Sequence, residues 1–224
     1  LVYCSIRVRE TLPVEKRLAG DFTTTFQTYS KLLKNSYFMG FCLVQCFSFV
    51  TLFAYISGSS FVFQGIYGVS PQMFSMIFGA NGAGLLLCNA LTKRLTGFVE
   101  DIRLLKWSLS ISLFGSILLL LGFWMNGSLW IILLLLFITI SVFSMMGATS
   151  FSLAMRAEAK NAGSAAALLG FFSSALGALM GPLVGVGDSL SALPMGILML
   201  AGELMAFLAF LCLILPGFKK LQTE

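Results

Sequence analysis

Glu203 is the only acidic side chain that lies deep inside a long apolar run of this sequence. A carboxyl group in an apolar medium is costly unless it is protonated, hydrogen-bonded or close to water. Two interpretations follow from this placement. Glu203 is either a group that takes up and releases protons, or a neutral group that bonds to a neighbouring helix.

Amide side chains are the other prominent polar groups within apolar runs, and Gln45 and Asn81 are the main examples. Each can line a pathway or simply bond across helices. The abundant Phe and Met residues can form an adaptable apolar binding surface. Contact with lipid or with the protein core accounts for most of them equally well.

The amino-acid composition argues against catalysis and metal binding by this chain. The sequence contains no histidine, which excludes histidine-based acid–base catalysis and histidine metal ligands within this chain. Its five cysteines form no CxxC pair, so we expect free thiols. The sequence has no recognisable phosphate-binding loop or nucleophile–base pair. We therefore expect no enzyme activity, no cofactor and no metal site.

The elements that position these side chains are membrane helices, because the composition is that of an integral membrane protein. Of the 224 residues, 58% are hydrophobic and 10% are charged, and the mean hydropathy is +0.95. So few charges cannot cover a soluble domain of this size. The net charge of +5 does not indicate nucleic-acid binding, because the basic residues lie at the ends of apolar runs and face lipid headgroups.

The apolar runs predict an all-α membrane bundle of six spans, since about 20 helical residues cross a bilayer. The bundle covers residues 36–216, with spans near 37–61, 74–91, 107–125, 129–155, 162–186 and 194–215. All 14 Lys and Arg residues then fall on the face that receives both chain ends. By the positive-inside rule this face is cytoplasmic.

The segments outside the bundle have their own compositions. Residues 1–13 begin inside an apolar run and exit through charges and Pro13, so we interpret them as the end of an earlier membrane helix. Residues 14–35 predict an amphipathic linker on the cytoplasmic membrane surface, with a solvated linker as the alternative. Residues 217–224 are expected to form a cytoplasmic tail. The sequence therefore looks like a fragment of a longer protein.

The fifth span carries small residues at steps of four and three, which places them on one helical face. They are Gly163, Ala167, Gly170, Ser174, Gly177 and Gly181. Small residues let another helix approach closely in lipid, and helix packing alone explains the stripe. Pro182 weakens the hydrogen-bond ladder, so we expect a bend near it.

Several stretches resemble the bicyclomycin/chloramphenicol-resistance (Bcr/CflA) family of drug:proton antiporters, within the major facilitator superfamily. The strongest resemblance covers residues 162–185, and the second covers residues 53–71. Glu10-Thr11-Leu12-Pro13 is similar to the end of the family's sixth helix. Together these stretches cover nearly the whole chain in the right order.

The resemblance implies that this chain is the C-terminal half of a twelve-helix transporter, joined by its linker to an N-terminal half. Gly177, Gly181, Pro182 and Gly185 are similar to the family's antiporter motif, here in the pseudo-symmetric partner of the helix that carries it. Lys93 and Arg94 resemble the basic pair of the superfamily's cytoplasmic loop motif. The partners implied are the lipid bilayer, the other half and a small drug-like substrate.

In that fold the central cavity is lined by what are here the first, second, fourth and fifth spans. The resemblance therefore makes Gln45, Tyr55, Asn81 and Phe151 candidates for the substrate cavity. Glu203 falls on a peripheral helix, which favours the neutral interpretation. The implied function is export of small, mostly apolar compounds across the inner membrane by alternating access, with the proton as coupling ion.

Three alternatives remain open. An exporter or importer of metabolites shares the fold. A membrane scaffold that transports nothing would tolerate apolar side chains at Gln45 and Asn81. A membrane enzyme would need catalytic groups beyond those present in this sequence.

Overall fold

The computed structural model describes residues 22–185 and 191–218, and all regular structure within these ranges is helical. The helices in chain order are α2 (Phe22–Lys34), α3 (Ser36–Ser60), η2 (Phe61–Ile66), α4 (Pro71–Leu95), α5 (Asp101–Trp124), α6 (Leu129–Ala157), η3 (Ala159–Asn161), α7 (Ala162–Ala178), α8 (Met180–Gly185), α9 (Leu193–Ala209) and η4 (Phe210–Ile214). The predicted segment 1–13, the first part of the linker and most of the tail lie outside the described residues.

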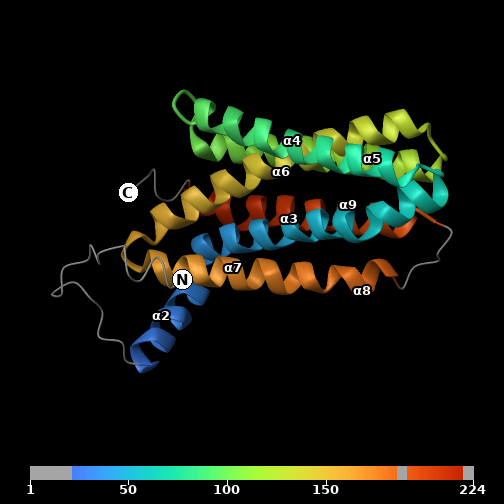
Figure 1. Ribbon diagram of the computed structural model, residues 1–224. Coiled ribbons are helices and arrows are strands. Elements are labelled where there is room, and N and C mark those ends of the chain that lie inside the picture. Colours follow the sequence, from blue (N-terminus) through green and yellow to red (C-terminus); the bar gives the residue numbers. More distant parts are fainter. Residues whose placement is uncertain (1–21, 186–190, 219–224) are drawn as a thin grey trace, which may run out of the picture.

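Among the described residues, six helical stretches are long and apolar enough to cross a membrane, which confirms the predicted all-α membrane bundle. They are Ser36–Ile66, Pro71–Leu95, Asp101–Trp124, Leu129–Ala157, Ala159–Val184 and Leu193–Phe218. In Figure 1, α3 and α9 lie side by side, with α4, α5 and α6 on one side of them and α7 on the other. The protein is therefore a multi-pass membrane protein.

Two helices begin before the predicted spans, α4 by less than one turn and α5 by more than one, because the residues at their N-termini favour a helix start. α4 begins at Pro71, where the hydroxyl of Ser70 accepts a hydrogen bond from the N–H of Met73 at 3.3 Å. Proline suits the first turn, whose N–H groups have no partner within the helix. α5 begins at Asp101, whose carboxylate favours the positive end of the helix dipole. The loop between α4 and α5 is correspondingly shorter than predicted.

α3 is the central helix of the bundle and lies against α6, α7 and α9. In its most apolar stretch 56% of the residues are buried, compared with 11% in α4. One apolar cluster surrounds Phe38 and Phe41 near the start of α3, and a second surrounds Ala54 and Phe63 near its far end. The bundle core therefore follows α3, whereas α4 lies at its edge.

The fifth span is broken between α7 and α8, one turn before Pro182. Pro182 has no N–H to donate to the carbonyl of Ala178, which lies four residues earlier, and its ring crowds that carbonyl. α7 ends at Ala178. The expected distortion thus takes the form of a break on the N-terminal side of the proline.

The described part of the linker is the amphipathic helix α2, which packs against α3 and α7. Leu32 is 1% exposed, whereas Phe26 is 76% exposed. Asn35 caps α3 by accepting a hydrogen bond from the N–H of Tyr37, and its Nδ2 donates to Oε1 of Glu158 at 2.6 Å. These contacts hold α2 against the bundle. The location of α2 on a membrane surface stays a prediction.

Tyr67 joins two turns at the opposite end of the bundle. Its hydroxyl donates to the carbonyl oxygen of Gly127 at 3.3 Å, which links the end of the first span to the turn before α6. Partial burial raises the pKa of Tyr67. Gly68 follows with a φ of +64°, a conformation that favours glycine.

Candidate functional site

The first candidate site is a pocket between α3, α6 and α7 that brings together two of the predicted cavity residues, Gln45 and Phe151. Its volume is about 150 Å³. Its lining consists of Gln45, Phe49, Phe151, Ala166, Leu169, Gly170, Ser173 and Ser174. None of these side chains carries a charge, so the pocket suits an uncharged or weakly polar molecule.

Gln45 is the polar group of this pocket with an unused bonding atom. Its side-chain oxygen is buried and has no hydrogen-bond partner among the described residues. The neighbouring helix α6 presents Gly147 here, and a methyl group added at Gly147 would lie 3.9 Å from Nε2 of Gln45. The Gln45 oxygen is therefore an unpaired acceptor on a residue that lines the pocket.

The sequence did not single out Phe49 as a site residue, although it lies one turn after Gln45 on α3. Its ring packs edge-on against Phe143 of α6, with 5.4 Å between the ring centroids. The helical spacing from Gln45 was the available signal, but many other Phe residues show similar spacings. Ser173 also lines the pocket, and its hydroxyl lies 3.9 Å from the sulfur of Cys46.

Tyr55 and Asn81, the other two predicted cavity residues, are joined directly. Nδ2 of Asn81 donates to the hydroxyl of Tyr55 at 3.1 Å and to the carbonyl oxygen of Ile77 at 3.1 Å. Phe78 stacks on the Tyr55 ring, with 5.6 Å between centroids. Both Tyr55 and Asn81 are 3% exposed. The structure thus fixes α4 to α3 through this pair.

A second pocket, of about 360 Å³, lies between α4 and α6. Its lining consists of Ile77, Ala80, Asn81, Trp130, Leu133, Leu134 and Phe137. It includes Asn81 but not Tyr55. Gln45 and Phe151 therefore line one pocket and Asn81 lines another, so the four predicted cavity residues do not converge on a single site within the described part of the chain.

Glu203 lies away from both pockets, completely buried on α9. Its polar neighbours are the hydroxyl groups of Ser112 on α5 and Thr51 on α3. Neither carboxyl oxygen forms a hydrogen bond of standard geometry with a described residue. One residue earlier, a methyl group added at Gly202 would lie 2.8 Å from the backbone oxygen of Phe47. Glu203 therefore lies in a tightly closed junction of three helices.

The stripe of small residues on the fifth span divides into two parts. Gly163 and Gly170 are exposed, and nothing lies within 4 Å of a methyl group added at either position. Gly177 is buried, and an added methyl there would lie 2.7 Å from the ring of Phe53 on α3. The same methyl at Gly181 would lie 3.8 Å from the hydroxyl of Ser57, an ordinary contact. Only the later part of the stripe packs against α3.

The other two motif residues of the fifth span lie near its end. Pro182 is exposed, and Gly185 is the last residue of α8. Among the described residues, no helix of this chain covers Pro182 closely enough to bury it. The break between α7 and α8 therefore interrupts the motif, so its residues do not form one continuous packing face.

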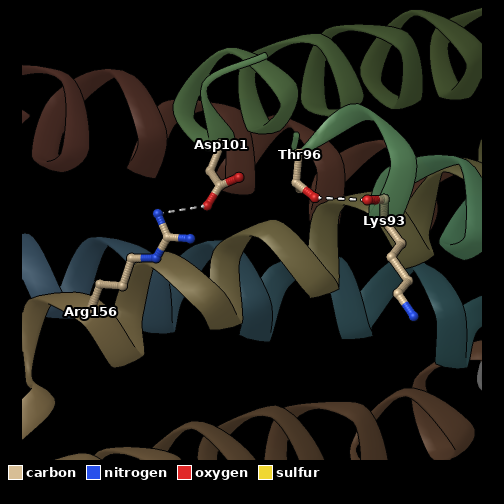
Figure 2. A network of polar contacts seen from close by, with 4 residues as sticks. All are labelled: Lys93, Thr96, Asp101 and Arg156. Atoms are coloured by element: carbon tan, nitrogen blue, oxygen red, sulfur yellow. Dashed lines mark hydrogen bonds and ion pairs between the residues drawn. The ribbon is translucent and has the colours of Figure 1, made fainter. Parts of the chain in front are cut away.

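Lys93 and Arg94 lie in the last turn of α4, and an ion pair that the sequence did not indicate lies nearby at the start of α5. Figure 2 shows Asp101 at the start of α5 facing Arg156 on α6, with 3.2 Å between Oδ2 and Nη1. The hydroxyl of Thr96 donates to the backbone carbonyl of Lys93 at 3.1 Å, as Figure 2 also shows. The side chains of Lys93 and Arg94 are exposed and have no ion-pair partner among the described residues.

No group of three or more histidine, cysteine, aspartate or glutamate residues that could hold a metal lies within the described ranges. What these ranges do offer is a helical bundle with uncharged pockets along two sides of α6. Such an arrangement can bind a molecule between membrane helices.

Comparison with known proteins identifies the family. The family model of the Major Facilitator Superfamily matches residues 1–182. This chain belongs to the Major Facilitator Superfamily. It is 37% identical over 206 residues to an uncharacterized MFS-type transporter, YdgK, of Bacillus subtilis (strain 168), covering 92% of this chain and 51% of the relative.

A second relative is a bicyclomycin resistance protein homolog of Haemophilus influenzae. It is 26% identical over 203 residues, covering 91% of this chain and 51% of the relative. The chain thus spans about half the length of the curated relatives it matches. No solved structure matches it significantly. Membership of this superfamily points to a transporter.

Proposed function

We propose that this chain is the C-terminal half of a proton-driven exporter of small, mostly apolar, drug-like compounds. The substrate would bind between the helices and cross the membrane as two helical bundles rock about it. The Haemophilus influenzae relative, named as a bicyclomycin resistance homolog, supports export of a drug. The alternatives within the superfamily are an exporter or an importer of a metabolite.

The observation that carries the proposal is the uncharged pocket between α3, α6 and α7. Its lining combines aromatic rings at Phe49 and Phe151 with one free acceptor at Gln45. Pockets of this kind bind mainly through apolar area, while a few polar groups fix orientation. A strongly charged metabolite would find no opposite charge here. A compound with an apolar body and a hydrogen-bond donor would match the lining.

The other partner in the proposal is a second six-helix bundle that covers the open faces of this one. Only 11% of the apolar stretch of α4 and 22% of that of the fifth span are buried. Both helices present glycines with open space around them, Gly79 and Gly82 on α4 and Gly163 and Gly170 on α7. Glycine-rich faces allow close helix contact in lipid. The remaining exposed apolar surface would face lipid.

Accumulation of radiolabelled chloramphenicol in cells that lack their main efflux pumps tests the proposal. Cells expressing the full-length protein should accumulate less of the drug, and a protonophore should abolish the difference. Gln45→Leu should weaken export about fivefold at equal membrane abundance, as expected for one lost hydrogen bond of about 1 kcal/mol. Gln64→Leu is the matched control, because Gln64 donates to Ser60 outside both pockets.

Three outcomes would each contradict a part of the proposal. Greater accumulation in expressing cells would make the protein an importer. Export that a protonophore leaves unchanged would remove the proton as coupling ion. Equal export by the wild type and Gln45→Leu would remove the pocket between α3, α6 and α7 from the transport route.

We further propose that the protein lies in the inner membrane, with the α4–α5 loop and both ends of this chain in the cytoplasm. Single cysteines at Gln64 and Lys93, in a protein without its natural cysteines, test this orientation. A membrane-impermeant maleimide added to whole cells should label the cysteine at position 64 and spare that at position 93. Labelling of both positions would contradict the orientation.

A further inference from the structure

We infer that α5 binds a phospholipid with a negatively charged headgroup, at the end of the helix that carries Arg103 and Lys106. This inference goes beyond the proposed function, because the lipid is a partner other than the substrate and no residue of α5 lines either pocket described above. It rests on a pair of cations at one end of α5 and on a strip of large apolar side chains that continues from them along the same face.

The outer face of α5 is the side that no other described helix covers. α5 packs against α6 and α9 through its other sides. Its exposed residues recur every three or four positions from Arg103 to Trp124, which places them on one side of the helix. The cations and the apolar strip therefore belong to a single continuous surface.

The apolar part of the outer face has the composition of a surface in contact with lipid. Trp107, Phe114 and Leu121 are between 44% and 62% exposed. Gly115 faces inward, since a methyl group added there would meet the hydroxyl of Thr139 on α6. Small residues mediate close helix contacts in membranes, and here they lie on the packed side. The second bundle of the proposed function would instead use the open, glycine-bearing faces of α4 and α7.

The cations of the outer face are available to an anion. Lys106 is exposed and has no ion-pair partner within the described ranges. Arg103 pairs with Glu100, with 3.0 Å between Nε and Oε2, but both side chains are more than half exposed. Such surface pairs are weak, and a guanidinium can bind phosphate through two parallel hydrogen bonds. The neighbouring acid Asp101 faces Arg156 on α6 instead, as Figure 2 shows.

The spacing of these groups along α5 matches the two parts of a phospholipid. Arg103 and Phe114 are about 16 Å apart along the helix axis, at a rise of about 1.5 Å per residue. One leaflet contributes roughly 15 Å to the hydrocarbon core of a bilayer. A lipid phosphate at Arg103 would therefore place an acyl chain along Trp107 and Phe114. A soluble phosphate would leave the apolar strip unused, and a zwitterionic headgroup carries a positive group that Arg103 and Lys106 repel.

Trp107 is a natural reporter, because it follows Lys106 directly on the outer face and is 52% exposed. In the full-length protein, every other tryptophan is replaced by phenylalanine, including Trp124 and Trp130. The probes are phosphatidylglycerol and phosphatidylcholine with bromine atoms on the acyl chain close to the headgroup. Each is mixed at the same mole fraction into phosphatidylcholine vesicles that contain the protein. Bromine quenches tryptophan fluorescence at close contact, so the two quenching curves give the relative affinity of the lipids.

We expect phosphatidylglycerol to bind beside Trp107 about three- to tenfold more tightly than phosphatidylcholine, as basic side chains near an anionic headgroup provide. Arg103→Gln combined with Lys106→Gln should abolish this preference. Lys31→Gln combined with Lys34→Gln is the matched control, because it removes the same charge from α2, which packs against α3 and α7. The control should keep the preference.

A second variant changes the preference in the opposite direction and tests Arg103 itself. Glu100→Gln removes the carboxylate that competes with a lipid phosphate for Arg103. The preference for phosphatidylglycerol should rise about two- to fivefold, the effect of releasing one exposed ion pair. An unchanged preference in Glu100→Gln would show that the phosphate does not lie at Arg103 and would overturn the inference.

Three further results would also overturn it. Equal quenching by the two lipids in the wild type would show that the outer face does not distinguish headgroup charge. Quenching by neither lipid would show that another bundle or a second copy of the protein covers Trp107. Loss of the preference on addition of inorganic phosphate would assign the cations to a soluble anion. These measurements use neither a drug nor a proton gradient, so their failure is distinguishable from a failure of proton-driven export.

Discussion

The bundle contains two kinds of buried polar region, and they differ in what surrounds them. The carboxyl group of Glu203 and the hydroxyl of Ser112 are enclosed by α3, α5 and α9. The amide oxygens of Gln45 and Asn81 are equally without partners, but each belongs to a residue that lines a pocket. The closed junction has to satisfy its polar groups internally, whereas the pocket residues can bond to a ligand.

The junction around Glu203 therefore serves helix packing, whereas the two pockets are the regions where binding would take place. Thr51 already donates to the backbone oxygen of Met199 at 3.2 Å, so the junction around Glu203 joins α3 to α9 through polar as well as apolar contacts. Within the described ranges, the side-chain oxygens of Gln45 and Asn81 have no hydrogen-bond partner, so they add no such contact between helices. Substitutions in the junction should therefore affect folding, and substitutions at the pockets should affect binding.

The largest effect is expected from Glu203→Lys. This change places a cation in a site that is 0% exposed and has no described acidic neighbour, at a cost of several kcal/mol. Glu203→Gln is the control, because it keeps the shape and can bond to Ser112 and Thr51. Size-exclusion chromatography after heating should show loss of folded protein for the lysine variant and only a small shift for the glutamine variant.

The two variants also separate the roles of Glu203. If Glu203→Gln keeps the fold and proton-driven export, the neutral, helix-bonding interpretation holds. If Glu203→Gln folds but no longer couples export to the proton gradient, Glu203 is the group that carries the proton, and the division between junction and pockets is wrong.

A smaller effect is expected from Gly202→Ala. The added methyl group would lie 2.8 Å from the backbone oxygen of Phe47 and 2.8 Å from the hydroxyl oxygen of Thr51. Since backbone cannot move away as a flexible side chain does, we expect a destabilisation of about 1–3 kcal/mol. The matched variant Gly181→Ala meets only an ordinary contact with Ser57 and should leave the thermal midpoint nearly unchanged. Equal midpoints for both variants would contradict a closed junction at Gly202.

The fold was predictable from the sequence because hydrocarbon selects long apolar helices, and their charged ends determine the topology. The small-residue spacing identified the face around Gly170, but not that this part is open while Gly177 meets Phe53. That distinction depends on the angle between α3 and α7, which no local pattern encodes. The break at Ala178 was predictable to within one turn, since Pro182 acts on the carbonyl four residues earlier.

The candidate sites were predictable in part. Amides within apolar runs are few, so Gln45 and Asn81 stood out, and the family resemblance placed them near the cavity. The sequence did not show that they line different pockets or that Phe49 and Trp130 contribute to these. Aromatic residues are common in membrane helices, so their types alone carry little information. The surroundings of Glu203 depend on Ser112 and Thr51, which come from two other helices.

The smallest effect is expected where a polar contact is open to water, at the ion pair of Asp101 and Arg156 in Figure 2. The Arg156 side chain is 73% exposed, although that of Asp101 is only 6% exposed. Water screens the arginine, so Arg156→Gln should cost less than about 1 kcal/mol and less again at high salt. Asp101→Asn should cost somewhat more, because it also removes the charge that favours the first turn of α5. Thermal midpoints of both variants at low and high salt measure these differences. If Arg156→Gln lowered the thermal midpoint as much as Gly202→Ala does, this contact would be closed to water, like the junction around Glu203.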